Sequence, residues 1–199
     1  MDHAMTAHGP AESTEVMGTV RSKVGMWLFL GSDSLTFGAL LASYGAMRTG
    51  SPDWPVPGHI LNIPLTALNT FILICSSVTM VKALSAIRHG DPKGLQKYLM
   101  GTILGGVTFL SIQAYEWTRL IRHDGLSLRK DLFCATFFSL TGFHGCHVFA
   151  GVVYLLVILG LSKRGAFSAE NYHRVEVAGL YWHFVDLVWI LVFTFVYLV

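Results

Sequence analysis

The sequence predicts an all-α, polytopic membrane protein, a bundle of five transmembrane helices with its N-terminus inside and its C-terminus outside. Of its 199 residues, 53% are hydrophobic and only 13% are charged, whereas about 25% are charged in a typical soluble domain. Five apolar runs each reach the length of about 20 residues that a helix needs to cross the hydrocarbon of a bilayer. Lysine and arginine are unevenly distributed among the segments between these runs, and this bias predicts the orientation.

The five runs are separated by glycine, proline and charged residues, which are typical of turns. We expect residues 24–199 to form one transmembrane domain. Residues 1–23 carry Asp2, Glu12 and Glu15 without an apolar segment, so we expect a mobile tail there and not a cleaved signal peptide. The expected spans are Val24–Met47, Asn62–Val81, Tyr98–Thr118, Leu132–Leu161 and Val177–Val199.

Charge distribution and cysteine content bear on the orientation in the membrane, on nucleic-acid binding and on disulfide formation. The tail and the second and fourth connecting segments carry nine Lys and Arg residues, against five on the opposite side, which places the N-terminus on the inner side of the membrane. A net charge of +2 without a basic stripe argues against a nucleic-acid partner. The three cysteines stand far apart in apolar runs, so we expect small buried residues and no disulfides.

Ionisable side chains within the apolar runs are the candidate functional residues, because charge inside a membrane is costly and is usually turned toward a partner or a cavity. At 1.5 Å per residue, Asp33 lies about 14 Å from the inner boundary of its run, and the histidines reach a comparable depth. A shared polar layer near the midplane is therefore expected. The candidates are Asp33, Glu116, His144, His147, His183 and Asp186.

Two of these pairs, His144 with His147 and His183 with Asp186, are spaced i, i+3, so each pair lies on one helical face. Three interpretations remain open. The pairs can form a hydrogen-bonded network that fixes the register of the helices, a site for iron, copper or zinc, or a proton relay centred on Asp33. Glu116, near the outer end of its run, is expected to snorkel or to pair at the membrane interface.

The string YWHFVDLVW at residues 181–189 resembles the signature of subunit III of haem-copper respiratory oxidases. Four further motifs occur in the order of that family, so that the resemblance covers all five runs. Small residues near these motifs, including Gly105, Gly106 and Gly151, are expected to let helices approach closely. The four motifs are FLGSD at 29–33, NT at 69–70 with CSS at 75–77, IQAYEW at 112–117 and TGFHGCHV at 141–148.

The resemblance implies an accessory subunit without its own cofactor, catalytic residue or metal ligand, in the short five-helix form found in bacterial inner membranes. Haem and copper would lie in the partner subunits I and II, with a subunit IV or a respiratory supercomplex as further partners. Members of this family are thought to stabilise the catalytic subunit I, to sustain proton uptake in a proton-pumping oxidase and to hold structural phospholipid.

Carried over by position, Asp33 matches the family's buried carboxylate, and His144, His147, His183 and Asp186 match its polar motif positions. His173 and Glu176 resemble a family HxxE pair at the inner interface. A lipid head group or a partner loop is expected there, with Arg174 as the charge partner of a lipid phosphate.

The electron donor of the complex is left open by one departure from the family pattern. Many cytochrome c oxidases carry Glu at the position of Asp33, and Asp there is similar to bacterial quinol oxidases. Cytochrome c oxidase is the first hypothesis, and quinol oxidase and a homologue associated with nitric oxide reduction are alternatives. An autonomous proton or metal channel is a hypothesis of a different class, which the absence of an internal repeat argues against.

Overall fold

The computed structural model describes residues 10–123, 125–126 and 131–199, and within them it contains only helices. Five helices are long and apolar enough to cross a membrane, which confirms the predicted fold class. The elements are α1 (Pro10–Gly50), α2 (Pro57–Ile60), α3 (Ile63–Arg88), α4 (Pro92–His123), α5 (Leu132–Lys163), α6 (His173–Phe193) and the π-helical turn η1 (Thr194–Leu198).

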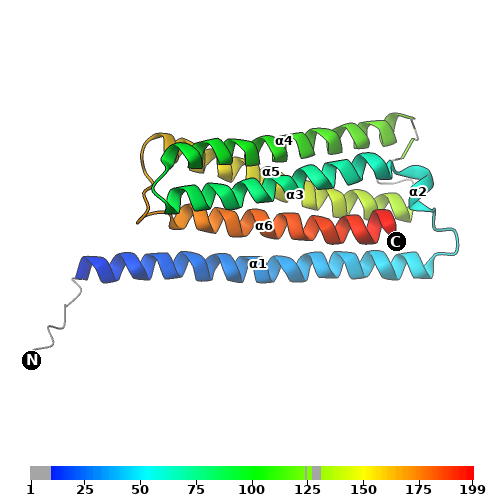
Figure 1. Cartoon of the computed structure of the whole chain (residues 1–199). Coiled ribbons are helices and arrows are strands. Elements are labelled where there is room, and N and C mark those ends of the chain that lie inside the picture. The colour runs from blue at the N-terminus through cyan, green and yellow to red at the C-terminus, as the bar shows by residue number, and fades with distance from the viewer. Residues whose placement is uncertain (1–9, 124, 127–130) are drawn as a thin grey trace, which may run out of the picture.

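The five long helices lie side by side with alternating direction, so the start of α1 and the end of α6 lie at opposite ends of the bundle (Figure 1). Helices α3, α4, α5 and α6 form the body of the bundle, and α3 and α4 share its most extensive contact. Helix α1 lies along one edge and packs on α6 and α5. Only 17% of its apolar stretch is buried, against 50% for α6, so most of α1 faces outward.

Helix ends fall at the turn residues expected from the sequence. After α3, Gly90 adopts φ +74°, its N–H donates to the carbonyl of Ile87 and the N–H of Asp91 donates to that of Ala86. This is the Schellman pattern, which requires a left-handed residue that glycine provides most easily. The Asp91 carboxylate then accepts from the N–H of Gly94 and caps the start of α4.

The first helix begins within the expected N-terminal tail. Helix α1 begins at Pro10, so residues 10–23 are helical, and residues 1–9 lie outside the described residues. Hydropathy indicates only where the apolar run of a helix begins. The helix itself can extend beyond that run, as far as a capping or helix-breaking residue. Between Pro10 and Gly50 no proline interrupts the chain, and acidic residues near a helix N-terminus are favourable.

Close packing in the body of the bundle depends on glycines opposite large aromatic rings, as the sequence predicted. Trp182 on α6 is 1% exposed. A Cβ at Gly106 on α4 would lie 2.5 Å from the Trp182 ring, and one at Gly151 on α5 would lie 3.0 Å from it. The glycines therefore allow α4 and α5 to close on the indole.

The expectation that all three cysteines are buried is wrong for two of them. Cys134 is buried, but Cys75 and Cys146 are exposed on the outer surface of the bundle. Large apolar side chains such as Phe71 and Phe149 share this exposure. Because lipid tails are as apolar as a protein core, an apolar membrane helix has no need to turn such residues inward.

Candidate functional site

The central feature of the site is a contact between α1 and α5, in which the Nε2 atom of His147 lies 3.1 Å from the Oδ2 atom of Asp33. The two side chains are 14% and 9% exposed, respectively. Asp33 stands within the inward stripe of α1 with Leu30 and Phe37, and the Phe37 ring packs 5.3 Å from the His147 ring. The contact is thus enclosed by apolar groups near the middle of the α1 span.

The hydrogen bonds of His147 determine what this contact needs chemically. Its Nδ1 atom lies 2.8 Å from the carbonyl oxygen of Phe143, one turn earlier on α5. A carbonyl only accepts, so Nδ1 must carry a proton there. The atom Nε2 then faces a carboxyl oxygen, and this contact is favourable when one further proton lies on either the imidazole or the carboxyl group. Asp33 and His147 are therefore placed close enough to share one proton.

The position of α6 is coupled to the same site. The hydroxyl of Tyr181 donates to the backbone carbonyl of His147 at 2.9 Å. The Tyr181 ring also lies 6.2 Å from the ring of Phe29 on α1. One tyrosine therefore connects the three helices that surround the Asp33 and His147 pair.

His144 does not join His147, although the two residues are three positions apart. Its ring is fully buried, stacked on Trp189 of α6 at 4.8 Å and in edge contact with Phe109 of α4 at 5.8 Å, while Phe37 of α1 lies farther away, at 6.3 Å. His147 instead points toward α1. Residues at i and i+3 are rotated by about 60° from each other around the helix axis, so the two rings can point toward different neighbouring helices.

Asp186 binds a residue that the sequence analysis did not single out. Its Oδ2 atom accepts a hydrogen bond of 2.7 Å from the hydroxyl of Ser77 on α3, and both residues are 8% exposed. His183, one turn away on α6, is only half-buried and lies within electrostatic reach of Asp186. The i, i+3 pair therefore connects α6 to α3 through its aspartate.

The described residues contain no group of three or more His, Cys, Asp and Glu side chains placed to hold a metal ion. The Asp33 and His147 contact lies between α1 and α5, and the Asp186 and Ser77 contact lies between α3 and α6. His144 packs on Trp189 and Phe109, apart from both contacts. Among the described residues, the side chains that the metal interpretation combined thus lie in separate interhelical spaces.

We expect Asp186→Ala to lower the melting temperature of the assembled complex, because it leaves the Ser77 hydroxyl without its partner in an apolar environment. Hydrogen bonds between membrane helices contribute about 0.6–2 kcal/mol. Ser43→Ala is the matched control, because the exposed Ser43 hydroxyl only donates to Ala39 of its own helix. Equal melting temperatures for Asp186→Ala and the wild type, measured by thermal dissociation, would contradict the assigned contact.

Glu116 lies inside the bundle, and its predicted snorkelling geometry is corrected. It is 5% exposed and accepts hydrogen bonds from the hydroxyls of Thr66 on α3, at 3.0 Å, and Tyr197 in η1, at 3.2 Å. Thr66 lies in the first turn of α3, and Tyr197 lies in η1, near the end of the chain. Both hydroxyls thus reach Glu116 from elements other than its own helix. Two hydroxyls arriving from other elements satisfy the carboxylate, so it has no need to reach the lipid surface.

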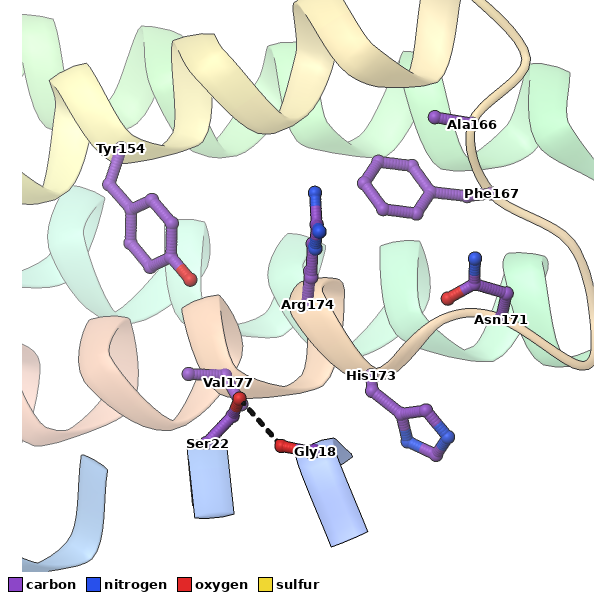
Figure 2. A pocket seen from close by; sticks show the side chains of 9 residues that line it. All are labelled: Gly18, Ser22, Tyr154, Ala166, Phe167, Asn171, His173, Arg174 and Val177. Atoms are coloured by element: carbon purple, nitrogen blue, oxygen red, sulfur yellow. Dashed lines mark hydrogen bonds between the residues drawn. The ribbon is translucent and has the colours of Figure 1, made fainter. Parts of the chain in front are cut away.

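Glu176 joins the first long helix to the rest of the bundle at the end where α1 and α6 begin. It pairs with Lys23 of α1 at 2.8 Å and with Arg88 of α3 at 3.4 Å, and His173 lies 3.9 Å away. The structure thus brings the predicted His173 and Glu176 together. Two basic side chains from other helices, Lys23 and Arg88, also pair with Glu176. Arg174 is exposed and points into a separate space (Figure 2).

The residues that the sequence analysis missed are mostly partners supplied by other helices. Ser77, Thr66 and Tyr197 are neutral and common in apolar runs, so nothing in their local sequence distinguishes them. Ser77 does lie within the CSS motif that carries part of the family resemblance. That motif is the one signal that could have identified it.

A family model described as cytochrome c oxidase subunit III matches residues 5–199. The chain belongs to the cytochrome c oxidase subunit III family. Cytochrome c oxidase subunit 3 of Synechocystis sp. is 42% identical over 176 residues, which cover 87% of this chain and 74% of the relative. That of Thermostichus vulcanus is 38% identical over 176 residues, covering 88% and 86%. Quinol oxidase subunit 3 of Bacillus spizizenii is 32% identical over 199 residues, covering 100% and 97%.

The resemblance drawn from the motifs is therefore confirmed. As a subunit III, the chain forms part of a respiratory oxidase complex with other oxidase subunits. Within this subunit, two buried polar contacts join helices, one between α1 and α5 and one between α3 and α6. The relatives carry the names of both cytochrome c oxidases and quinol oxidases.

Proposed function

We propose that this chain is the accessory, cofactor-free subunit III of a proton-pumping cytochrome c oxidase in a bacterial inner membrane, with its N-terminus inside. It stabilises the catalytic subunit I, supports proton uptake and binds structural phospholipid. Haem and copper in the partner subunits I and II supply the chemistry of oxygen reduction. The residues of this chain position helices and hold a proton at Asp33 and His147.

The single observation that carries the proton-uptake role is the enclosed contact of 3.1 Å between Asp33 and His147. A carboxylate at this depth is unfavourable unless it is paired or protonated. The pair retains a favourable contact whether the proton lies on the acid or on the imidazole. Supporting proton transfer into a neighbouring subunit requires a group of this kind, able to accept and release a proton without leaving the membrane.

The stabilising role is supported by the outward face of α1. Trp27 is 62% exposed, Leu28 71% and Leu35 77%, and a Cβ added at Gly31 or Gly38 would meet no other atom within 4 Å. Small residues on a membrane helix allow close approach of another helix. A partner subunit packed there would cover the side of α1 that the bundle leaves open.

A quinol oxidase is the second candidate, and the full-length similarity to quinol oxidase subunit 3 of Bacillus spizizenii favours it. The contacts of this chain serve either enzyme, because the electron donor binds elsewhere in the complex. The identity of the donor therefore depends on the copper content of subunit II.

The proposed function is tested by purifying the complex through a tag on this chain in mild detergent. The preparation is analysed by a reduced-minus-oxidised optical spectrum, subunit mass spectrometry and metal analysis. We expect haem bands together with a copper-bearing subunit II. Haem without that copper would indicate the quinol enzyme. A preparation free of haem and partners, with proton conductance in liposomes, would contradict subunit function and favour the channel.

A further inference from the structure

Glu116 is a buried acidic side chain that the proposed function does not use. It lies on α4 and is 5% exposed, and no ion pair joins it to a basic side chain among the described residues. Arg119, on the next turn of α4, lies within electrostatic reach but is itself exposed. A carboxylate without a paired cation is costly inside a membrane, and uptake of a proton removes that cost.

The hydroxyl of Tyr197 determines the role of one oxygen of Glu116. It donates to Oε2 at 3.2 Å, and Tyr197 is 1% exposed, with its ring 5.7 Å from that of Phe137. Tyr197 is held there by the π-helical turn η1, in which the N–H of Val199 donates to the carbonyl of Thr194. A neutral phenol has one proton to donate. The atom Oε2 is therefore an acceptor, and a proton on Glu116 belongs on Oε1.

The oxygen Oε1 faces a hydroxyl that has two acceptors within reach. The Oγ1 atom of Thr66 lies 3.0 Å from Oε1 of Glu116 and 3.1 Å from the backbone carbonyl oxygen of Asn62. A hydroxyl has one proton to donate and can also accept. When Glu116 is ionised, Thr66 donates to Oε1. When Oε1 carries a proton, Glu116 donates to Thr66 and Thr66 donates to Asn62, so that each contact of the cluster has its own proton.

This cluster lies at a different depth from the contact between Asp33 and His147. Helices α1 and α4 end at the same end of the bundle (Figure 1). At 1.5 Å per residue, Glu116 lies about 10 Å from the end of its helix, whereas Asp33 lies about 25 Å from the end of its own. The two acids therefore belong to separate sites.

We propose that Glu116 binds a proton on Oε1 and forms a second proton-holding site of this subunit, closed by Thr66 of α3 and Tyr197 of η1. The proton is held as a neutral carboxylic acid, in which Oε1 donates to Thr66 and Oε2 accepts from Tyr197. Release breaks the O–H bond at Oε1 and passes the proton to water, and the Thr66 hydroxyl then turns to Oε1. The site does not depend on the proposed role of Asp33 and His147 in proton uptake.

The test is infrared difference spectroscopy of the assembled oxidase at neutral pH, with the wild type compared with Glu116→Gln. A protonated carboxyl group has a C=O stretching band that carboxylates and amides lack. We expect Glu116→Gln to lose one such band, and we expect that band to shift to lower wavenumber when D2O replaces water. Glutamine is nearly isosteric, its carbonyl can accept from Tyr197 and its amide can donate to Thr66. Assembly is therefore retained, which subunit mass spectrometry checks.

Tyr197→Phe tests the assigned geometry, because loss of the donor to Oε2 is expected to shift the band of Glu116 to higher wavenumber. Tyr115→Phe is the matched control, since Tyr115 neighbours Glu116 along α4 but is 63% exposed. It should leave the band in place. Identical spectra of the wild type and Glu116→Gln in this region would show that Glu116 is ionised and would overturn the proposal. A band that Tyr197→Phe or D2O leaves unmoved would also overturn it.

Discussion

Asp33→Asn is expected to slow proton uptake by the oxidase and to shorten its catalytic lifetime severalfold while leaving its subunit composition unchanged. Asparagine is nearly isosteric with aspartate, and its amide can still donate a hydrogen bond to Nε2 of His147, so the contact between α1 and α5 is retained. It cannot release or take up a proton, so the pair loses its proton-holding role. The readouts are proton uptake in proteoliposomes and the number of turnovers before inactivation.

Ser32→Ala is the control for this prediction. Ser32 neighbours Asp33, but its exposed hydroxyl donates only to the Phe29 carbonyl of its own helix. Ser32→Ala should therefore behave like the wild type in both readouts. An Asp33→Asn enzyme that takes up protons at the wild-type rate and lasts as long would exclude Asp33 from proton uptake.

Gly106→Val is expected to produce the largest loss of stability among single substitutions in the bundle. A Cβ there would lie 2.5 Å from the Trp182 ring and 2.7 Å from Val152, and Trp182 is 1% exposed and donates to Ser76. The indole has no free space to move into, so α4 must separate from α5 and α6. Overpacking of a filled core costs about 1–3 kcal/mol, and thermal dissociation of the complex measures it.

Gly160→Val is the matched control, because a Cβ at Gly160 on α5 would meet nothing within 4 Å. Both substitutions place the same β-branched residue in a helix and so share its effect on helix propensity. The difference between their melting temperatures isolates the contact with Trp182. Equal melting temperatures would show that the indole does not fill this space.

The helices and their ends were predictable because they depend on local chemistry. Apolar runs of membrane length predict the spans, and Gly90 and Gly165, both at positive φ, follow α3 and α5 where glycines were expected to break them. The start of α1 was not predictable from hydropathy, because a polar helical segment outside the apolar run has the composition of an unstructured tail. The ion pair between Lys23 and Glu176 joins that turn to α6.

The candidate site was predictable as a set of residues but not as a set of contacts. Depth along the helices correctly singled out Asp33 and His147 as residues of one level. Spacing alone could not show that His144 turns toward Trp189, or that Asp186 finds Ser77 rather than a histidine. Those choices depend on how the helices are rotated about their axes, which packing against neighbouring helices decides.

The most direct test of the central claim is a double-mutant cycle on Asp33 and His147 in the assembled oxidase. Proton uptake and catalytic lifetime are measured for Asp33→Asn, His147→Gln and the double variant. If the two side chains hold one proton as a unit, removing the second after the first has little further effect, and the double variant resembles the more impaired single variant. The account would be contradicted if the fold-loss in the double variant equalled the product of the fold-losses in the two single variants. That result would show that Asp33 and His147 act independently.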